Sequence, residues 1–110
     1  MSRRAGDMLF LSGFGPVKDG EVIGSNIEEQ TIFTMDAMKD VLESEGATWD
    51  HAMRVNVFLL NMQDRDGFNA TYMNYFKKPQ RMPTRRLIGA GDMYMGILVE
   101  IDAVAYLGET

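Results

Sequence analysis

Apolar and polar residues follow the spacing of strands in some segments and of helices in others, and the first segment has a strand pattern. A short apolar run at residues 8–11 is followed by Gly13 and by Gly15-Pro16. Such a run before turn residues is typical of a buried strand that leaves into a loop. Asp19-Gly20 comes next with apolar residues on both sides, which predicts a hairpin turn with positive φ angles.

The following segment has the periodicity of a helix. Ser25 and Asn26 each have a glutamate three residues later, Glu28 and Glu29, so two overlapping capping boxes are candidates for the helix start. Gly46 is a suitable residue for the C-terminal stop. The buried face is expected to carry Ile32, Met35, Met38, Val41 and Leu42. One face of this helix is therefore expected to pack against a flat surface.

A strand and a second helix are predicted after it. Thr48-Trp49-Asp50 indicates a single helical turn, and residues 53–60 begin with the polar-apolar alternation of a strand. Asp64 or Asp66 is expected to cap the second helix, which Pro79 and Pro83 end. Its apolar residues fall at helical spacing and are Phe68, Tyr72, Tyr75 and Phe76. Core packing explains this aromatic stripe better than base stacking on single-stranded RNA does.

Two more strands, at residues 84–90 and 97–106, complete the predicted order of strand, hairpin, helix, strand, helix, strand, strand. This order indicates an α+β fold in which both helices cover one face of a sheet. A length of 110 residues fits one domain over residues 1–110. On the last strand, Glu100 and Asp102 share a face with apolar residues, a surface typical of a subunit interface or a pocket wall.

Composition and charge narrow the possible functions. The formal net charge of −5 works against general nucleic-acid binding, although five basic residues gather at Lys77, Lys78, Arg81, Arg85 and Arg86. With no cysteine and a single histidine, His51, one chain offers no thiolate site and no multi-histidine metal site. The short apolar stretch near the N-terminus is neither a signal peptide nor a membrane span, so we expect a soluble, unprocessed, cytoplasmic protein.

The candidate chemistry lies near the C-terminus. Pro83-Thr84-Arg85 precedes Glu100 by fifteen residues, counted from the arginine, and Glu100 lies inside an apolar, β-branched run. An unpartnered charge in such a run costs on the order of several kcal/mol. Arg85 offers a planar fork for a substrate carboxylate, and Glu100 could then direct a water molecule in the same crevice. The alternative for Arg85 is a structural ion pair with Glu100 or Asp102. A glycosidase-like pair of Glu100 and Asp102 is disfavoured because no aromatic sugar platform lies near them.

Seven segments of the chain, taken in sequence order, match the sequence pattern of a known family. They are GDMLFLSG (6–13), IEEQT (27–31), VLESEGA (41–47), VNVFL (55–59), FNATYMNYF (68–76), PTR (83–85) and VEIDAVA (99–105). Together they resemble the reactive intermediate deaminase family, also called Rid or YjgF, over nearly the whole chain.

The resemblance implies a chorismate-mutase-like subunit, a homotrimer with clefts between neighbouring subunits, and hydrolysis of enamines or imines such as 2-aminoacrylate to 2-ketoacids and ammonia. It implies no metal and no organic cofactor. In this family pattern Arg85 binds the substrate carboxylate and Glu100 positions the attacking water. The remaining cleft positions are Ser12, Gly13, Asn69 and the backbone N–H of Leu87.

Two departures from the family pattern concern the cleft. The leading segment that in many members brings a tyrosine into the cleft is missing before Met1, and Arg86-Leu87 stand where a small hydroxyl residue and often a cysteine or apolar residue are usual. The sequence thus predicts an enamine/imine deaminase. The alternatives are a non-catalytic binding module for a 2-ketoacid and, less favoured, an endoribonuclease. Ser12 is a hydrogen-bonding residue rather than a nucleophile, because no histidine lies in its segment.

Overall fold

A five-stranded mixed sheet forms the centre of the structure. The computed structural model describes residues 1–108, and the strands lie in the order β1-β2-β7-β5-β6. Their bounds are β1 Ser2–Ala5, β2 Met8–Phe14, β5 Ala52–Leu59, β6 Thr84–Gly89 and β7 Val99–Tyr106. β7 runs antiparallel to both β2 and β5, whereas β5 and β6 are parallel. The last strand of the chain therefore lies in the middle of the sheet, and β6 lies at an edge.

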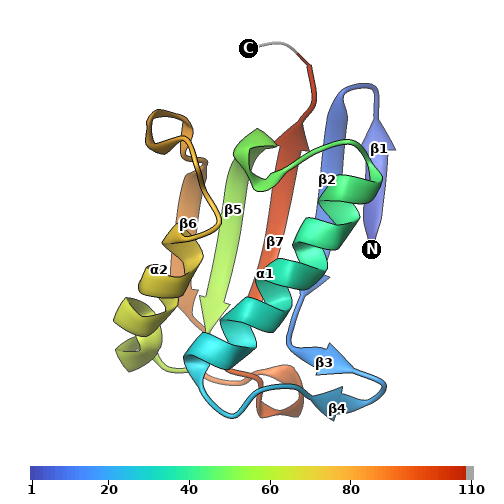
Figure 1. Ribbon diagram of the computed structural model, residues 1–110. Coiled ribbons are helices and arrows are strands. Elements are labelled where there is room, and N and C mark those ends of the chain that lie inside the picture. Colours follow the sequence, from blue (N-terminus) through green and yellow to red (C-terminus); the bar gives the residue numbers. More distant parts are fainter. Residues whose placement is uncertain (109–110) are drawn as a thin grey trace.

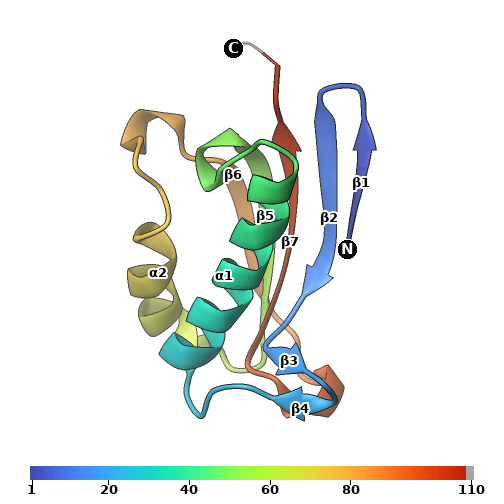
Figure 2. The ribbon, with the colours of Figure 1, turned by 45° about the vertical axis from the view of Figure 1, so that its right-hand side comes forward.

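Both long helices cover the same face of this sheet. Figures 1 and 2 show α1 (Ile27–Ser44) and α2 (Arg65–Met73) side by side against it, with a small hairpin of β3 (Val17–Lys18) and β4 (Glu21–Val22) near the start of α1. Single 3-10 turns occupy Trp49–His51, Met62–Asp64, Pro79–Arg81 and Tyr94–Gly96. The predicted α+β fold with both helices on one sheet face is confirmed. No helix within residues 1–108 is long and apolar enough to cross a membrane.

Strand alternation decides which residues the helices cover. Val99, Ile101, Ala103 and Ala105 of β7 are buried on the helix side, as are Val55, Val57 and Leu59 of β5. The intervening residues of β7, including Glu100 and Asp102, point to the opposite face, where they are only half-buried. We call this uncovered surface the open face. It carries exposed apolar residues as well, since Phe10 is 45% and Ile88 43% exposed.

Several predicted start and stop signals are confirmed. Asn26 is the N-cap of α1, with its side chain accepting the N–H of Glu29 at 2.9 Å. Gly46 has a φ of 80° just beyond the end of the helix. Asp19 and Gly20 have φ angles of 52° and 79°, as a hairpin turn with two left-handed residues requires.

Two predictions at element level are wrong, and one strand was not predicted. Ile32, expected on the buried face of α1, is 46% exposed, because Thr31 and Thr34 occupy inward positions that a search for apolar residues passes over. Helix α2 ends at Met73, so Tyr75 and Phe76 lie beyond it, where the backbone bonds tighten to a three-residue spacing. Strand β1 was not predicted at all.

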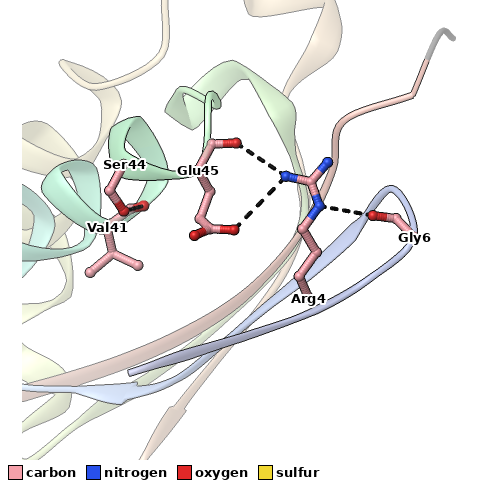
Figure 3. A network of polar contacts seen from close by, with 5 residues as sticks. All are labelled: Arg4, Gly6, Val41, Ser44 and Glu45. Carbon is pink, nitrogen blue, oxygen red and sulfur yellow. Dashed lines mark hydrogen bonds and ion pairs between the residues drawn. The ribbon is translucent and has the colours of Figure 1, made fainter.

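A polar network ties the hairpin of β1 and β2 to the end of α1. Arg4 donates from Nε to the carbonyl of Gly6 at 2.9 Å and from its guanidinium to the carbonyl of Glu45 at 3.3 Å (Figure 3). The same guanidinium lies 3.8 Å from the Glu45 carboxylate. These contacts hold an edge strand that has little apolar surface of its own to bury.

Candidate active site

Arg85 lies on the helix side of the sheet, at its edge. In the β5–β6 pairing Arg85 is opposite Val55, which in turn is opposite Ala103 of β7, and both of these are buried beneath the helices. Residues paired across neighbouring strands point to the same face. The Arg85 guanidinium accordingly lies over two rings of α2, with its central carbon 5.0 Å from the Tyr72 centroid and 5.7 Å from that of Phe68.

No carboxylate neutralises this guanidinium. Within residues 1–108, Arg85 forms no ion pair and no hydrogen bond to another side chain or backbone group. Asp102, one of its expected ion-pair partners, accepts a hydrogen bond of 2.8 Å from the Asn56 amide on the open face. The alternative of a structural ion pair with Glu100 or Asp102 is thus not realised inside one chain. The donors of Arg85 are available to a ligand.

A pocket of about 310 Å³ adjoins Arg85. It is lined by Asn69, Tyr72, Met73, Met82, Pro83 and Arg85. Two of its lining residues, Asn69 and Tyr72, have a buried side-chain oxygen with no hydrogen-bond partner among the described residues. Buried polar atoms of this kind are uncommon because losing water without a replacement partner costs free energy. Both oxygens are closed off from solvent, so they lie beneath the pocket wall rather than open to a ligand.

The ionisation state of Tyr72 follows from its surroundings. Burial raises the pKa of its phenol to about 12, and the nearby positive charge of Arg85 offsets only part of that rise. The phenol is therefore neutral at physiological pH.

The backbone of β6 adds a donor on the same side. Ala90 donates its N–H to the carbonyl of Leu59 at 2.8 Å, so its amide points toward β5. Because amide directions alternate along a strand, the N–H of Leu87 points away from β5, toward the unpaired edge of the sheet. Arg85, Asn69 and the Leu87 amide form one group, which we call the arginine half-site.

Glu100 belongs to a second group on the open face. It is opposite Phe58 in the β5–β7 pairing, at the positions between the buried residues of both strands. A Cβ atom built on Gly13 would lie only 3.0 Å from Oε2 of Glu100, so the carboxylate extends across β2 at a position where glycine leaves room for it.

A bulge in β2 contains Ser12 together with Gly13. Leu11 pairs with Ala103 and Phe14 with Ile101, so two residues, Ser12 and Gly13, stand opposite the single residue between those partners. The Ser12 hydroxyl is exposed and donates to the carbonyl of Met1 at 3.2 Å. Ser12, Gly13 and Glu100 form the glutamate half-site.

The two half-sites do not meet within one chain. Arg85 and Glu100, expected from the sequence to face one crevice, lie on opposite faces of the sheet. Of the other predicted site residues, Asn69 lines the pocket beside Arg85 and Gly13 lies against Glu100. Leu87 and Ser12 are assigned to the two groups by their positions next to these residues on β6 and β2. A single subunit therefore holds the parts of the predicted site without assembling them.

Sequence reasoning missed the aromatic surface beneath Arg85. It assigned Phe68 and Tyr72 to the core, and both rings are indeed buried, with exposed fractions of 0% and 1%. The same rings also carry the guanidinium on their outer side. No sequence signal distinguishes these two roles, because i, i+4 aromatic spacing on a helix is common to both.

Comparison with known proteins gives the class to which this architecture belongs. The family model described as endoribonuclease L-PSP matches residues 2–107. A RutC family protein of Saccharolobus solfataricus is 36% identical over 104 residues, which cover 93% of this chain and 81% of that protein.

Solved structures agree with this match. A Thermotoga maritima protein superposes with a TM-score of 0.90 at 27% identity, covering 98% of this chain and 85% of that one. A Rid family protein of Yersinia pestis superposes with a TM-score of 0.88 at 27% identity, covering 96% and 84%. The fold is that of the L-PSP structures. The chain belongs to this family, the Rid/YjgF family that its sequence motifs predicted.

Proposed function

We propose that this protein hydrolyses carboxylate-bearing enamines and imines, such as 2-aminoacrylate, to 2-ketoacids and ammonia. The observation that carries this proposal is the half-buried Arg85 guanidinium, which has no acid partner among the described residues and adjoins a pocket of about 310 Å³. A planar guanidinium with free donors suits a small carboxylate, because two parallel charge-assisted hydrogen bonds fix both position and orientation. Family membership supports the same chemistry.

The proposed site forms between two copies of the chain in a homotrimer. Each copy contributes an arginine half-site and a glutamate half-site on opposite faces of its sheet. The open face, with half-buried acids among exposed apolar residues, suits contact with a second copy better than contact with water. The arginine of one subunit then faces the glutamate of its neighbour.

The proposed reaction needs little more than orientation and one directed water. An enamine first takes a proton on carbon and becomes an imine, whose protonated form has an electrophilic carbon. Glu100 accepts a proton from water as the water oxygen bonds to that carbon and the C=N π electrons move to nitrogen. Glu100 then passes this proton to the nitrogen. The C–N bond breaks with its electrons on nitrogen while the hydroxyl group gives its proton to the Glu100 carboxylate and the C=O bond forms, and a 2-ketoacid and ammonia result. Arg85 and the Leu87 amide hold the carboxylate throughout.

A binding module without catalysis is the second candidate, because the arginine half-site can bind a 2-ketoacid without any help from Glu100. Endoribonuclease activity has less support, although the family model carries that description. Phe68 and Tyr72 are buried and offer no open face to a base, and the net charge of −5 opposes phosphate binding.

Ammonia release from an enamine generated in situ tests the proposal. We expect Glu100→Gln to lower the rate by about 100-fold or more, since positioned acid–base groups contribute roughly 10²–10⁴-fold. We expect Arg85→Ala to weaken binding of 2-oxobutyrate by about 10- to 100-fold through loss of charge-assisted hydrogen bonds. Arg65→Ala removes an exposed arginine whose one ion pair within residues 1–108 is with Asp66, and it is the control that should change neither quantity.

The outcomes separate the two candidates. A deaminase loses its rate enhancement in both site variants, whereas Glu100→Gln still binds 2-oxobutyrate. A wild-type protein that binds the ketoacid through Arg85 but never accelerates ammonia release is a binding module, and that result would contradict the proposed activity.

A further inference from the structure

The Arg85 side chain is held by aromatic faces rather than by hydrogen bonds. A long arginine side chain loses considerable rotamer freedom when it is fixed, so an unsupported guanidinium would be a poorly organised binding group. A carboxylate neighbour would fix it but would also occupy the N–H donors that a ligand carboxylate needs. Ring faces avoid that competition, because the π-electron cloud attracts the cation and accepts none of its in-plane N–H groups.

The rings below Arg85 are packed against other aromatic rings. Tyr72 and Phe68 stack with centroids 5.3 Å apart and an interplanar angle of 29°. The Phe76 ring packs against Tyr72 with centroids 4.8 Å apart and also contacts Trp49 at 5.7 Å. The platform is therefore anchored in the core of the subunit.

We propose that Tyr72 is the positioning residue of the arginine half-site, and that its ring sets the affinity for a carboxylate ligand by holding the Arg85 guanidinium over the pocket. This inference rests on the proposed carboxylate site. Tyr72 has the leading role because its centroid is 5.0 Å from the guanidinium carbon, against 5.7 Å for Phe68. The contact is attractive in a partly desolvated site, where cation–π interactions are stronger than at an open surface.

The ring and the hydroxyl of Tyr72 can be tested separately. The hydroxyl is buried and has no partner in the described part of the chain, so its removal leaves the contact between ring and guanidinium intact. Tyr72→Phe keeps the ring, and Tyr72→Leu replaces it with a smaller aliphatic side chain. Phe76→Leu removes an aromatic ring from the same cluster that makes no cation–π contact with Arg85, and it is the matched control for lost packing.

The first measurement is the dissociation constant of 2-oxobutyrate, determined by calorimetry on the intact protein. We expect Tyr72→Leu to weaken binding by about tenfold. Tyr72→Phe and Phe76→Leu should each stay within about twofold of the wild type. A Phe76→Leu variant as weak as Tyr72→Leu would overturn the inference, since general packing would then be the cause. A Tyr72→Phe variant as weak as Tyr72→Leu would also overturn it, because the hydroxyl would be responsible.

The second measurement is a double-mutant cycle on the free energy of unfolding in urea, which needs no ligand. Tyr72→Leu is compared in the wild-type background and in the Arg85→Gln background. We expect its effect to be smaller when the guanidinium is already absent. Equal effects in both backgrounds would contradict a contact between the two residues. If Tyr72→Leu does not fold, Phe68→Leu replaces it in both measurements, with the same expected direction.

These results are distinguishable from failure of the proposed function. A wild-type protein that binds 2-oxobutyrate without releasing ammonia leaves the role of Tyr72 standing. A wild-type protein that binds no small carboxylate overturns the carboxylate site and this inference together.

Discussion

At the scale of single residues, the two charged groups of the proposed site have contrasting surroundings. Arg85 lies on aromatic rings with its donors free, whereas Glu100 extends over a glycine in a strand bulge. Neither group has an opposite charge beside it within residues 1–108. Under the proposed function, the arginine binds an anionic ligand and the glutamate a water molecule.

Gly13 gives a direct test of the glutamate half-site. Gly13→Ala places a methyl group 3.0 Å from Oε2 of Glu100, which forces the carboxylate to move by a few tenths of an ångström. We expect ammonia release to fall by about tenfold, because small displacements of a catalytic group are costly. The free energy of unfolding should stay within about 0.5 kcal/mol of the wild type, as measured by urea denaturation.

Gly91→Ala is the matched control for that substitution. A Cβ atom at Gly91 meets nothing within 4 Å, and the residue does not have a positive φ. Full activity in Gly13→Ala, or an equal loss in Gly91→Ala, would argue against a catalytic carboxylate held over Gly13.

The sequence predicts which residues are candidates for the site, but it does not predict on which face of the sheet each of them lies. Arg85 and Glu100 stand out by residue type and apolar context alone. Their faces depend on how β6 pairs with β5 and β5 with β7, and that register is fixed by packing between strands far apart in the sequence. The same limit hid the role of Tyr72, which depends on where β6 lies relative to α2.

At the scale of elements, the start of α1 has the best-defined polar contacts. Glu29 accepts hydrogen bonds from the Ser25 backbone N–H at 2.8 Å and from its hydroxyl at 2.9 Å. These bonds favour the charged carboxylate and lower the pKa of Glu29 below its ordinary value of 4.5, the backbone bond being the larger cause. The sequence pattern of two overlapping capping boxes is thus resolved, with Asn26 as the cap and Ser25 as the partner of Glu29.

A pH dependence follows from the lowered pKa of Glu29. Because the folded-state pKa is below the unfolded value, the carboxylate stabilises the fold above pH 4.5, and this contribution disappears as the pH falls through the lowered folded pKa. We expect Glu29→Gln to be less stable than the wild type at neutral pH and to approach it at acid pH. Urea unfolding at a series of pH values measures the difference. Glu28→Gln, in the same turn but without a bond to Ser25, should show no such convergence.

Element boundaries show where local signals are reliable. Caps and turns were predictable because glycine, asparagine and aspartate determine the backbone locally, as at Gly46 and Asp19-Gly20. Strand β1 was missed because Ser2–Ala5 is polar and gains its structure by pairing with β2, supported by the Arg4 contacts. On α1, Met35, Met38 and Leu42 are buried as predicted, and only Ile32 was misplaced. Thr34 takes an inward position there, where its hydroxyl donates to the carbonyl of Gln30 at 2.8 Å.

At the scale of the whole molecule, the separation of the half-sites has a consequence for assembly. If Arg85 of one subunit serves Glu100 of the next, every site contains one residue from each of two chains. A closed ring of identical subunits with head-to-tail contacts satisfies this arrangement, and each copy then uses both of its faces. The proposal thus predicts that activity is restored when two different inactive variants assemble together.

Mixed assemblies of Arg85→Ala and Glu100→Gln test this consequence. When the two inactive variants are unfolded together and refolded at equal amounts, random mixing gives an intact Arg85–Glu100 pair in about one quarter of the sites. We expect ammonia release to recover to roughly that fraction of the wild-type rate, with native mass spectrometry confirming mixed trimers. Arg85→Ala mixed with the double variant should stay inactive, because no subunit then supplies the arginine. Mixed trimers without recovered activity would mean that the arginine and the glutamate do not act on one ligand.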